Sequence, residues 1–566
     1  MKKILLVLFF VFFASTSFAA SPVLFFSDLN WGPKTGWEQS ATKGAAVTIW
    51  GKNFGSANGS NKITACGVDI ISNDATYVAE WAVTGLVNHV ARGLERTTFW
   101  LKSTMNDGAG TISITVDGVT SNTIPFTITT GTIYFISVSD GDNSYNGLYS
   151  TRTGHSGSDG PFKDLLKFDP ANNPSGDGQY ICYIKAGTYT AIDSDGTFVY
   201  VNGPTGGSTK QKALISYPAE VPLINNAGQN KIFRSNSDGL ENSYYTYSKL
   251  YATGGIGLGG AYGDYWRIVG NHFKDMLTDA WTGVIWVNAS RYVYIYGNIS
   301  EHNGYDQYKH DVYIKSQASG AANIHVQYVY LGWNEFKDPY AGAAGYGGCI
   351  FVSRSSDSGT DTRDIYIHDN YFHGGNNDFI YTGDSTAIYN IYIYNNTFSG
   401  NTSGHAVIYI YFDTTNIYIY NNTFYNTIPG DDIISNDSGL TTTTKNNIFY
   451  ANNSQVIFHR SSGSIVSDHD LFYGEPVPSG TGITVTNPVT GDPQMVDPVN
   501  LNFHLQAASA ARNAGTSDVS SIVTKDHDGN SRPQESIYDI GAYEYTIGAV
   551  GSEGIFGITL RGGSFR

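Results

Sequence analysis

Short runs of alternating hydrophobic and polar residues recur along the second half of the chain. In NIYIYNNTF, the isoleucines Ile391 and Ile393 alternate with Tyr392 and Tyr394, so a strand places the isoleucines on one face and the tyrosines on the other. Related runs are YVYIYGNIS, IYIHDNYF and KNNIF, each containing an asparagine at or near the end of the apolar stretch. This repetition predicts a solenoid, because the aliphatic strand faces are buried only when one coil stacks on the next.

The recurring asparagines set the register of the predicted coils. Successive asparagines are 25 to 27 residues apart, except for two intervals of 36. We expect each asparagine to adopt left-handed backbone angles and to pair its amide with the asparagine one coil away. The phenylalanine two positions later should stack in the core. The asparagines are Asn271, Asn298, Asn334, Asn370, Asn396, Asn422 and Asn447, and the phenylalanines are Phe273, Phe336, Phe372, Phe398, Phe424 and Phe449.

The region before the repeats has the features of an N-terminal module and of an entry to the solenoid. Residues 22–130 contain short strand-like runs separated by Gly, Asn and Asp, which predicts a small antiparallel β-sandwich. The string VTIWGKNFG followed by ITACGVDI resembles the IPT/TIG immunoglobulin-like family, whose modules serve as spacers or weak binding platforms. We also expect residues 161–168 to form a short amphipathic helix that covers the open end of the solenoid.

The strings TIYFISVSDGDNSYNGLYS, GPFKDLLKF and YICYIKAGTYT resemble the opening of β-helix proteins of the pectate-lyase-like superfamily. That resemblance implies an all-β fold, a right-handed parallel β-helix, over residues 132–475. The string DHDGNSRPQESIYDIGAYEY resembles the closing segment that follows many bacterial β-helices, which places residues 476–546 in a closing segment with a structural role. Residues 547–566 form a Gly-rich tail.

The first twenty residues have the order of a secretory signal peptide, with two lysines, an apolar run and small residues at the end. We therefore expect a protein that is exported, secreted or held at the cell surface, and monomeric, with no membrane insertion after cleavage. The formal net charge of -16 argues against a nucleic-acid partner, which needs a concentrated basic surface. The three cysteines are far apart, so buried free thiols are the expectation.

The two coils of 36 residues carry about ten extra residues each, and such loops on a rigid scaffold are where function concentrates. They contain EHNGYDQYKHDVYIKS and KDPYAGAAGYGGCIFVSRSSDSGTD. Aligning VYIK with IFVSR, FIYTGD and VIYIYFD predicts a line of polar groups along one strand edge. Those groups are Lys315, Arg354, Asp384 and Asp413 at its end, and His310, Asp378, His405 and Asp432 before it. Polar strand ends also serve solubility alone, so this line is a hypothesis about function.

A long shallow surface suits an extended polysaccharide, and a uronic-acid polymer would be cleaved by β-elimination. That reaction needs a base at C5 and a cation at the adjacent carboxylate, for which Lys315 and Arg354 are the candidates. His310 or Tyr313 would pass a proton to the leaving oxygen. Calcium could bridge protein and substrate through the acids Asp311, Asp357 and Asp378. Candidate substrate contacts are Tyr305, Tyr308, Tyr346, Asp384 and His405.

Two alternatives to the lyase stay open. An inverting glycoside hydrolase needs two carboxylates about 6.5 to 9.5 Å apart, and Asp378 with Asp384 is the first pair to test. The chain lacks the N-T-D, D-D, G-H-G and R-I-K set of polygalacturonase-like β-helices, which ranks the hydrolase below the lyase. The other alternative is a non-catalytic extracellular protein that binds glycans or mediates adhesion, or a structural β-helix.

Overall fold

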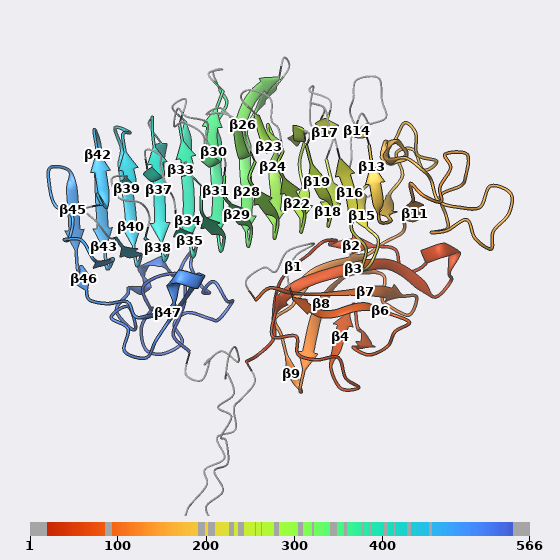
Figure 1. Cartoon of the computed structure of the whole chain (residues 1–566), viewed down its shortest axis with the longest axis horizontal. Helices are drawn as coiled ribbons and strands as arrows, with labels where there is room; N and C mark the ends of the chain where they lie inside the picture. Colours follow the sequence, from red (N-terminus) through yellow and green to blue (C-terminus); the bar gives the residue numbers. More distant parts are fainter. Residues whose placement is uncertain are drawn as a thin grey trace, which may run out of the picture.

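The chain folds into a right-handed parallel β-helix with two smaller units docked on one side of it (Figure 1). The computed structural model describes residues 20–546 of the 566, with internal gaps. The ranges excluded from it are 85–92, 191–198, 202–209, 226–230, 236–242, 255, 262, 277–281, 304–308, 320–321, 340–347, 356–358, 376–377, 384–386, 401–405, 413, 427–431 and 452–454. The expected signal peptide and the tail lie outside the described residues.

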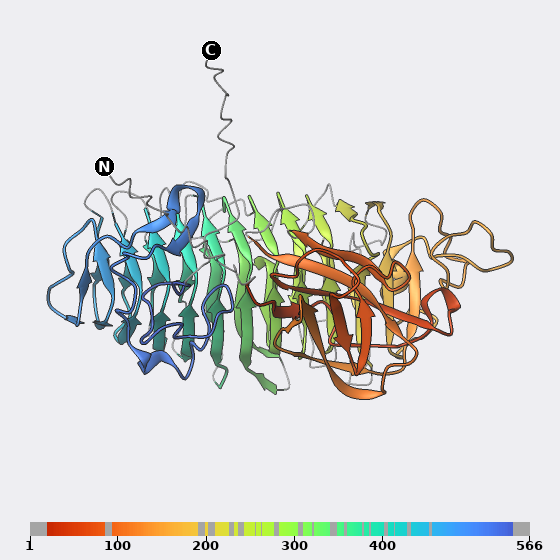
Figure 2. The ribbon, with the colours of Figure 1, turned by 90° about the horizontal axis from the view of Figure 1, so that it is seen from below.

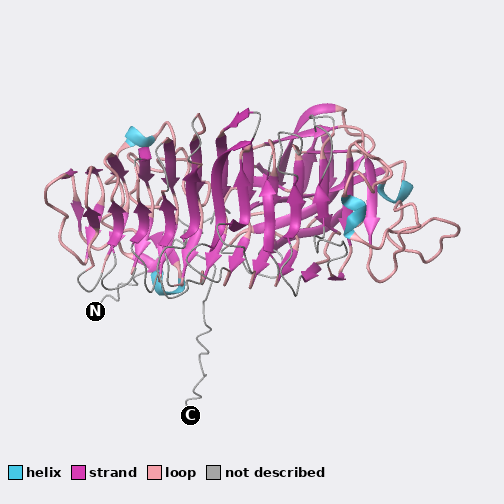
Figure 3. Ribbon diagram, turned by 90° about the horizontal axis from the view of Figure 1, so that it is seen from above, coloured by secondary structure: helices cyan, strands magenta, loops and turns pink. Residues whose placement is uncertain are grey.

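Three parallel sheets run the length of the solenoid, and we name them in the order in which the chain visits them (Figure 3). The first solenoid sheet consists of β11 (Thr132–Ile136), β12 (Tyr180–Ile184), β15 (Lys212–Ser216), β18 (Tyr245–Ser248), β21 (Arg267–Val269), β24 (Arg291–Tyr296), β28 (Val326–Gly332), β31 (Thr362–His368), β34 (Ile388–Tyr394), β37 (Thr414–Tyr420), β40 (Thr441–Lys445), β43 (Ser464–Asp468) and β45 (Ile483–Thr486).

The second solenoid sheet has the shortest strands. It consists of β13 (Gly187–Tyr189), β16 (Pro222–Asn225), β19 (Tyr251–Thr253), β22 (His272–Lys274), β25 (Ile299–Glu301), β29 (Glu335–Lys337), β32 (Tyr371–His373), β35 (Thr397–Ser399), β38 (Thr423–Tyr425), β41 (Ile448–Tyr450), β44 (Leu471–Tyr473) and β46 (Val489–Thr490).

The third solenoid sheet contains β26 and β30, the strands beside which the extra residues of the two expanded coils lie. It consists of β14 (Val199–Val201), β17 (Lys231–Ser235), β20 (Ile256–Ala261), β23 (Thr282–Asn288), β26 (Lys309–Ser319), β30 (Gly348–Arg354), β33 (Asp378–Thr382), β36 (Ala406–Ile410), β39 (Asp432–Asn436) and β42 (Phe458–Arg460), with β27 (Ala322–Ile324) paired to β26.

The N-terminal unit is a sandwich of two mostly antiparallel sheets. One sheet has the order β1 (Val23–Ser27), β3 (Lys43–Lys52), β7 (Glu95–Lys102) and β6 (Val78–Thr84). The other has the order β2 (Trp31–Gly32), β10 (Ile124–Ile128), β8 (Gly108–Val116), β4 (Lys62–Ala65) and β5 (Val68–Ile71), with β9 (Val119–Thr120) at its side. The IPT/TIG resemblance of this unit stays a prediction.

Helix is confined, in the described residues, to four short 3-10 turns. They are η1 (Trp37–Gln39), η2 (Leu165–Phe168), η3 (Pro498–Asn500) and η4 (Ser517–Val519). The amphipathic helix expected over 161–168 is therefore only the turn η2, which still buries Leu165 and Phe168 against the solenoid core. The closing segment contributes one hairpin, β47 (Met495–Asp497) with β48 (Asn502–Leu505).

The asparagine ladder forms as expected, with one difference in backbone geometry. The Nδ2 of each ladder asparagine donates to the Oδ1 of the next at 2.9 to 3.0 Å, from Asn271 through to Asn447, whose Nδ2 then donates to Asp470. The left-handed residue is the one before each ladder asparagine. These residues are Gly270, Gly297, Trp333, Asp369, Asn395, Asn421 and Asn446, with φ between +52° and +65°.

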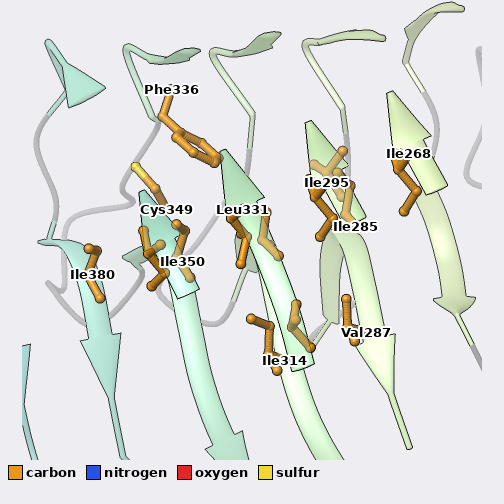
Figure 4. Packing of buried hydrophobic residues seen from close by; sticks show 14 of the residues in the cluster. Ile268, Ile285, Val287, Ile295, Ile314, Leu331, Phe336, Cys349, Ile350 and Ile380 are labelled. Atoms are coloured by element: carbon orange, nitrogen blue, oxygen red, sulfur yellow. The ribbon is translucent and has the colours of Figure 1, made fainter. Parts of the chain in front are cut away.

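The phenylalanine stack is continuous only from Phe336 onward. Successive rings from Phe336 to Phe449 lie 4.7 to 5.0 Å apart and nearly parallel. The prediction that Phe273 joins this stack is wrong, because Ser300 stands between Phe273 and Phe336 in the register. The aliphatic rows complete the core, and Figure 4 shows Ile295, Leu331 and Ile350 among the side chains gathered inside successive coils. All three cysteines are buried free thiols, as expected.

The left-handed row before the ladder faces outward and receives both docked units. A Cβ on Gly270 would lie 2.8 Å from the ring of Trp50, so glycine lets the sandwich approach the solenoid. Farther along, Asn395 and Asn446 donate through Nδ2 to the carbonyls of Lys525 and Thr516 in the closing segment. Seen from below, the sandwich therefore covers the N-terminal half of the solenoid and the closing segment covers later coils (Figure 2).

Candidate functional site

The third solenoid sheet carries the predicted site, and β26 is its longest strand. The extra residues of the first expanded coil prolong β26 and fold back as the antiparallel β27, with Gln317 opposite Ile324. The extra residues of the second coil fall largely in 340–347 and 356–358, outside the described part. The candidate residues that lie outside the described residues are Tyr305, Tyr308, Tyr346, Asp357, Asp384, His405 and Asp413.

One row of the sheet brings together three of the predicted polar groups. His310 is level with Gly283 in the preceding coil, Asp378 with Gly348, and Asp432 with Ala406. Because the strands pair in continuous register, these positions form one line at the start of the strands. His310 and Asp378 are 3% and 0% exposed, and Asp378 accepts a 3.0 Å hydrogen bond from the amide of Ala406. Asp432, in contrast, is half-buried and lies 3.4 Å from His459.

Asp311 faces the interior of the solenoid. Asp311 and Val312 are consecutive, yet both are buried, so the alternation of inward and outward side chains is broken at the start of β26. The Asp311 carboxylate accepts hydrogen bonds from Ser300 Oγ and, at 3.2 Å, from Asn303 Nδ2. Burial raises the pKa of Asp311 to about 6, although these two hydrogen bonds lower it. This placement corrects the expectation that Asp311 binds calcium at a polymer-facing surface.

The two predicted cations are not level with each other. Lys315 pairs with Ser353, and Arg354 pairs with Ser316 one position farther along. Arg354 donates through Nε to the carbonyl of Thr360 at 2.8 Å. Lys315 is partly exposed, its Nζ lies 5.8 Å from the centre of the Tyr313 ring, and within the described residues it forms no ion pair.

A stack of aromatic rings lines the outer face of the third sheet, and sequence reasoning missed it. Tyr313, Phe351, Tyr381 and Tyr409 stack at 4.6 to 5.3 Å, with the ring of Trp286 at the start of the row. The signal was an aromatic residue at one register position of successive coils. Tyr313, the predicted proton donor, is only 1% exposed within this stack.

The row ends in two exposed rings on the same side of the sheet. Tyr411 lies 5.7 Å from Tyr409 and 4.4 Å from Phe412, ring centre to ring centre. Tyr411 is 39% exposed and Phe412 is 44% exposed, so their rings can contact a ligand while those of the stack cannot.

Two of the three predicted calcium ligands, Asp311 and Asp378, are buried. Calcium takes six to eight oxygen ligands. Among the residues that the structure describes, no group of three or more His, Cys, Asp or Glu side chains is placed to hold a metal ion. Asp311 is enclosed by Ser300 and Asn303, and Asp378 is fully buried. A calcium site involving Asp357 stays a prediction.

Comparisons with known proteins give weak likenesses. A scan of protein-family models finds none that matches the chain, and a search of curated proteins finds no match either. Among solved structures, a Yersinia enterocolitica family 28 exopolygalacturonase is 10% identical with a TM-score of 0.37, over 81% of this chain and 100% of that one. XylC in complex with xylose is 9% identical with a TM-score of 0.39, over 73% and 99%. An alginate lyase from Paenibacillus sp. is 10% identical with a TM-score of 0.23, over 54% and 97%.

Likeness at this level does not assign an activity. No helix in the described residues is long and apolar enough to cross a membrane.

Proposed function

We propose that this is a secreted, carbohydrate-active β-helix protein that cleaves an acidic polysaccharide by β-elimination on the outer face of the third solenoid sheet. Lys315 carries the proposal. It lies on β26 in the first expanded coil, it is partly exposed, and no carboxylate of the described residues neutralises it. In a protein with a net charge of -16, such a cation is available to the carboxylate of a uronic acid.

In β-elimination a base removes the C5 proton, the C4–O4 bond breaks as the C4–C5 double bond forms, and the leaving oxygen takes up a proton. We assign Lys315 to the uronic carboxylate, whose neutralisation makes the C5 proton acidic enough to remove. Arg354 is the second cation of this edge, although its Nε already donates to Thr360. We assign both proton transfers, removal of the C5 proton and protonation of the leaving oxygen, to His310 and Tyr313, which are both almost fully buried.

Non-catalytic glycan binding is the second candidate, and the burial of His310 and Tyr313 favours it. The exposed rings of Tyr411 and Phe412 would then hold the polymer by contact with the apolar faces of its sugars. An inverting hydrolase has less support, because Asp378 is fully buried and bonded to the backbone of Ala406 rather than turned toward a substrate.

The test is incubation of the protein with polygalacturonate and alginate while the ultraviolet absorbance of the unsaturated product is followed. We expect product from the native protein and a loss of about a hundredfold in kcat/KM for Lys315→Ala, the size of effect seen when one electrostatic stabiliser of a transition state is removed. Lys337→Ala is the matched control, because Lys337 lies on β29 of the next coil but pairs with Glu301 at 3.0 Å.

Equal activity of Lys315→Ala and Lys337→Ala would remove Lys315 from the site. Binding of polymer without any unsaturated product would refute elimination and leave the non-catalytic alternative.

A further inference from the structure

A cleft of about 520 Å³ lies between the sandwich and the first solenoid sheet. One wall consists of Phe25 and Phe26 of β1 together with Pro125 of β10. The other wall consists of Tyr244, Tyr265 and Arg267 from two successive coils. In Figure 1, β1 and β2 lie directly below these coils. Clefts of this size at a junction of two units are common ligand sites.

The tyrosines of the cleft offer ring edges and hydroxyl groups. Tyr265 stacks on Tyr244 at 4.5 Å and on Tyr292 at 4.8 Å, so both of its faces are covered. It is nevertheless 37% exposed, so part of the side chain remains accessible to a ligand. Together with Asn30 and Gln211 on the lining, this surface combines apolar contact with neutral hydrogen-bonding groups.

Arg267 brings a positive charge to the cleft. Its Nη2 donates to the carbonyl of Ser27 at 2.6 Å and its Nε to the carbonyl of Asp28 at 3.1 Å. These contacts occupy two of the five N–H donors of a guanidinium. Within the described residues Arg267 forms no ion pair. Burial lowers the pKa of Arg267, while Tyr296, Tyr294 and Asp28 act in the opposite direction.

None of the described residues that line the cleft is acidic. The whole chain has 49 Asp and Glu against 33 Lys and Arg. A cleft whose lining contains no carboxylate and includes a half-buried arginine is complementary to an anion, and its aromatic edges and amides suit the body of a sugar ring.

We infer that this cleft is a second glycan-binding site, which takes a carboxylate-bearing sugar unit of an acidic polysaccharide against Arg267 and Tyr265. It lies on a different sheet from the proposed cleavage site and does not depend on turnover. The sandwich thereby becomes part of a binding site, because Ser27 and Asp28 hold the guanidinium in place and β1 supplies the facing wall.

The experiment is affinity electrophoresis of the full chain in gels that contain polygalacturonate, with xylan as the neutral probe. We expect the native protein to be retarded by polygalacturonate. Arg267→Gln should bind at least about tenfold more weakly, since a charge-assisted hydrogen bond is lost, and Tyr265→Ala should also bind more weakly. The matched control is Arg363→Gln, on the same sheet in a later coil, where the arginine is already paired with Asp361.

Arg267→Gln also removes two hydrogen bonds between the sandwich and the solenoid. If that variant unfolds, the binding site is tested by Tyr265→Ala, which leaves those hydrogen bonds intact. Absence of retardation of the native protein, or equal retardation of Tyr265→Ala and Arg363→Gln, would overturn the inference. The proposed β-elimination is tested by the turnover of Lys315→Ala, and the second binding site is tested by the gel retardation of the cleft variants. Either hypothesis can therefore fail without the other.

Discussion

Asp311 provides a sharp test of how this fold tolerates a buried carboxyl group. The prediction is that Asp311→Asn stabilises the protein at pH 8 and leaves its stability at pH 4 nearly unchanged. Asparagine has almost the same shape, and its Oδ1 can accept the bonds that Ser300 and Asn303 donate to the carboxylate. It differs in that it never ionises.

The magnitude follows from the pKa of Asp311, which burial raises from 3.8 to about 6. A group whose pKa is raised by folding contributes stability that is fully present below pH 4 and is lost as the pH rises through 6. A pKa that differs by about two units between the folded and unfolded states corresponds to about 3 kcal/mol. Removing the ionisable group should therefore raise the free energy of unfolding by about 3 kcal/mol at pH 8, relative to its effect at pH 4.

The assay is urea unfolding followed by tyrosine and tryptophan fluorescence, with the native protein and Asp311→Asn compared at pH 4 and pH 8. The comparison within each pH cancels the contributions of other titrating groups. If the free-energy difference between the two proteins is the same at both pH values, Asp311 is not a buried carboxyl whose ionisation opposes folding, and the reasoning fails.

Other predictions concern the ladder and the closing segment. Asn370→Ala removes four hydrogen bonds from the middle of the ladder and should lower the free energy of unfolding by about 4 kcal/mol in urea titrations. The control Thr415→Ala, at an exposed position of β37, should cost under about 1 kcal/mol. Asp470 ends the ladder with a pKa raised by burial to about 6, so Asp470→Asn should raise the urea midpoint at pH 8 and not at pH 4. Arg532→Met leaves the buried Glu544 carboxylate without its ion-pair partner and should lower the free energy of unfolding by about 3 to 5 kcal/mol. Adding Glu544→Gln should restore much of that free energy, and a double variant as unstable as Arg532→Met would contradict this account.

Local sequence was sufficient for the coil and its core. Ile391 and Ile393 alternate with tyrosines, so the inward face of β34 follows from strand geometry alone. The asparagine spacing predicted which amides pair across coils, because stacked coils bring equivalent residues together. The left-handed position was placed one residue too late, since the turn needs its strained residue just before the inward amide.

The candidate site was harder to predict from sequence, because it depends on where the alternation of inward and outward side chains along a strand is broken. Asp311 was proposed as a calcium ligand that bridges to the substrate, whereas in the structure it is buried beside Val312, where the alternation of inward and outward side chains is broken. Its neighbour Ser300 replaces a phenylalanine of the core stack, and the smaller side chain leaves a polar partner for the carboxylate. That exchange is recognisable only once the two strands are seen in one coil.

The sequence by itself determined the repeat, the inward rows, the ladder and the free thiols, because each depends on residues at a fixed spacing along the chain. The tertiary structure alone decided which faces of the solenoid are covered and which remain accessible. Arg267 reaches Ser27 and Asp28 across 240 and 239 residues, and the Asn395 amide reaches Lys525 across 130. Contacts between segments so far apart leave no periodic signal, and the cleft beside Arg267 exists only because the sandwich docks there.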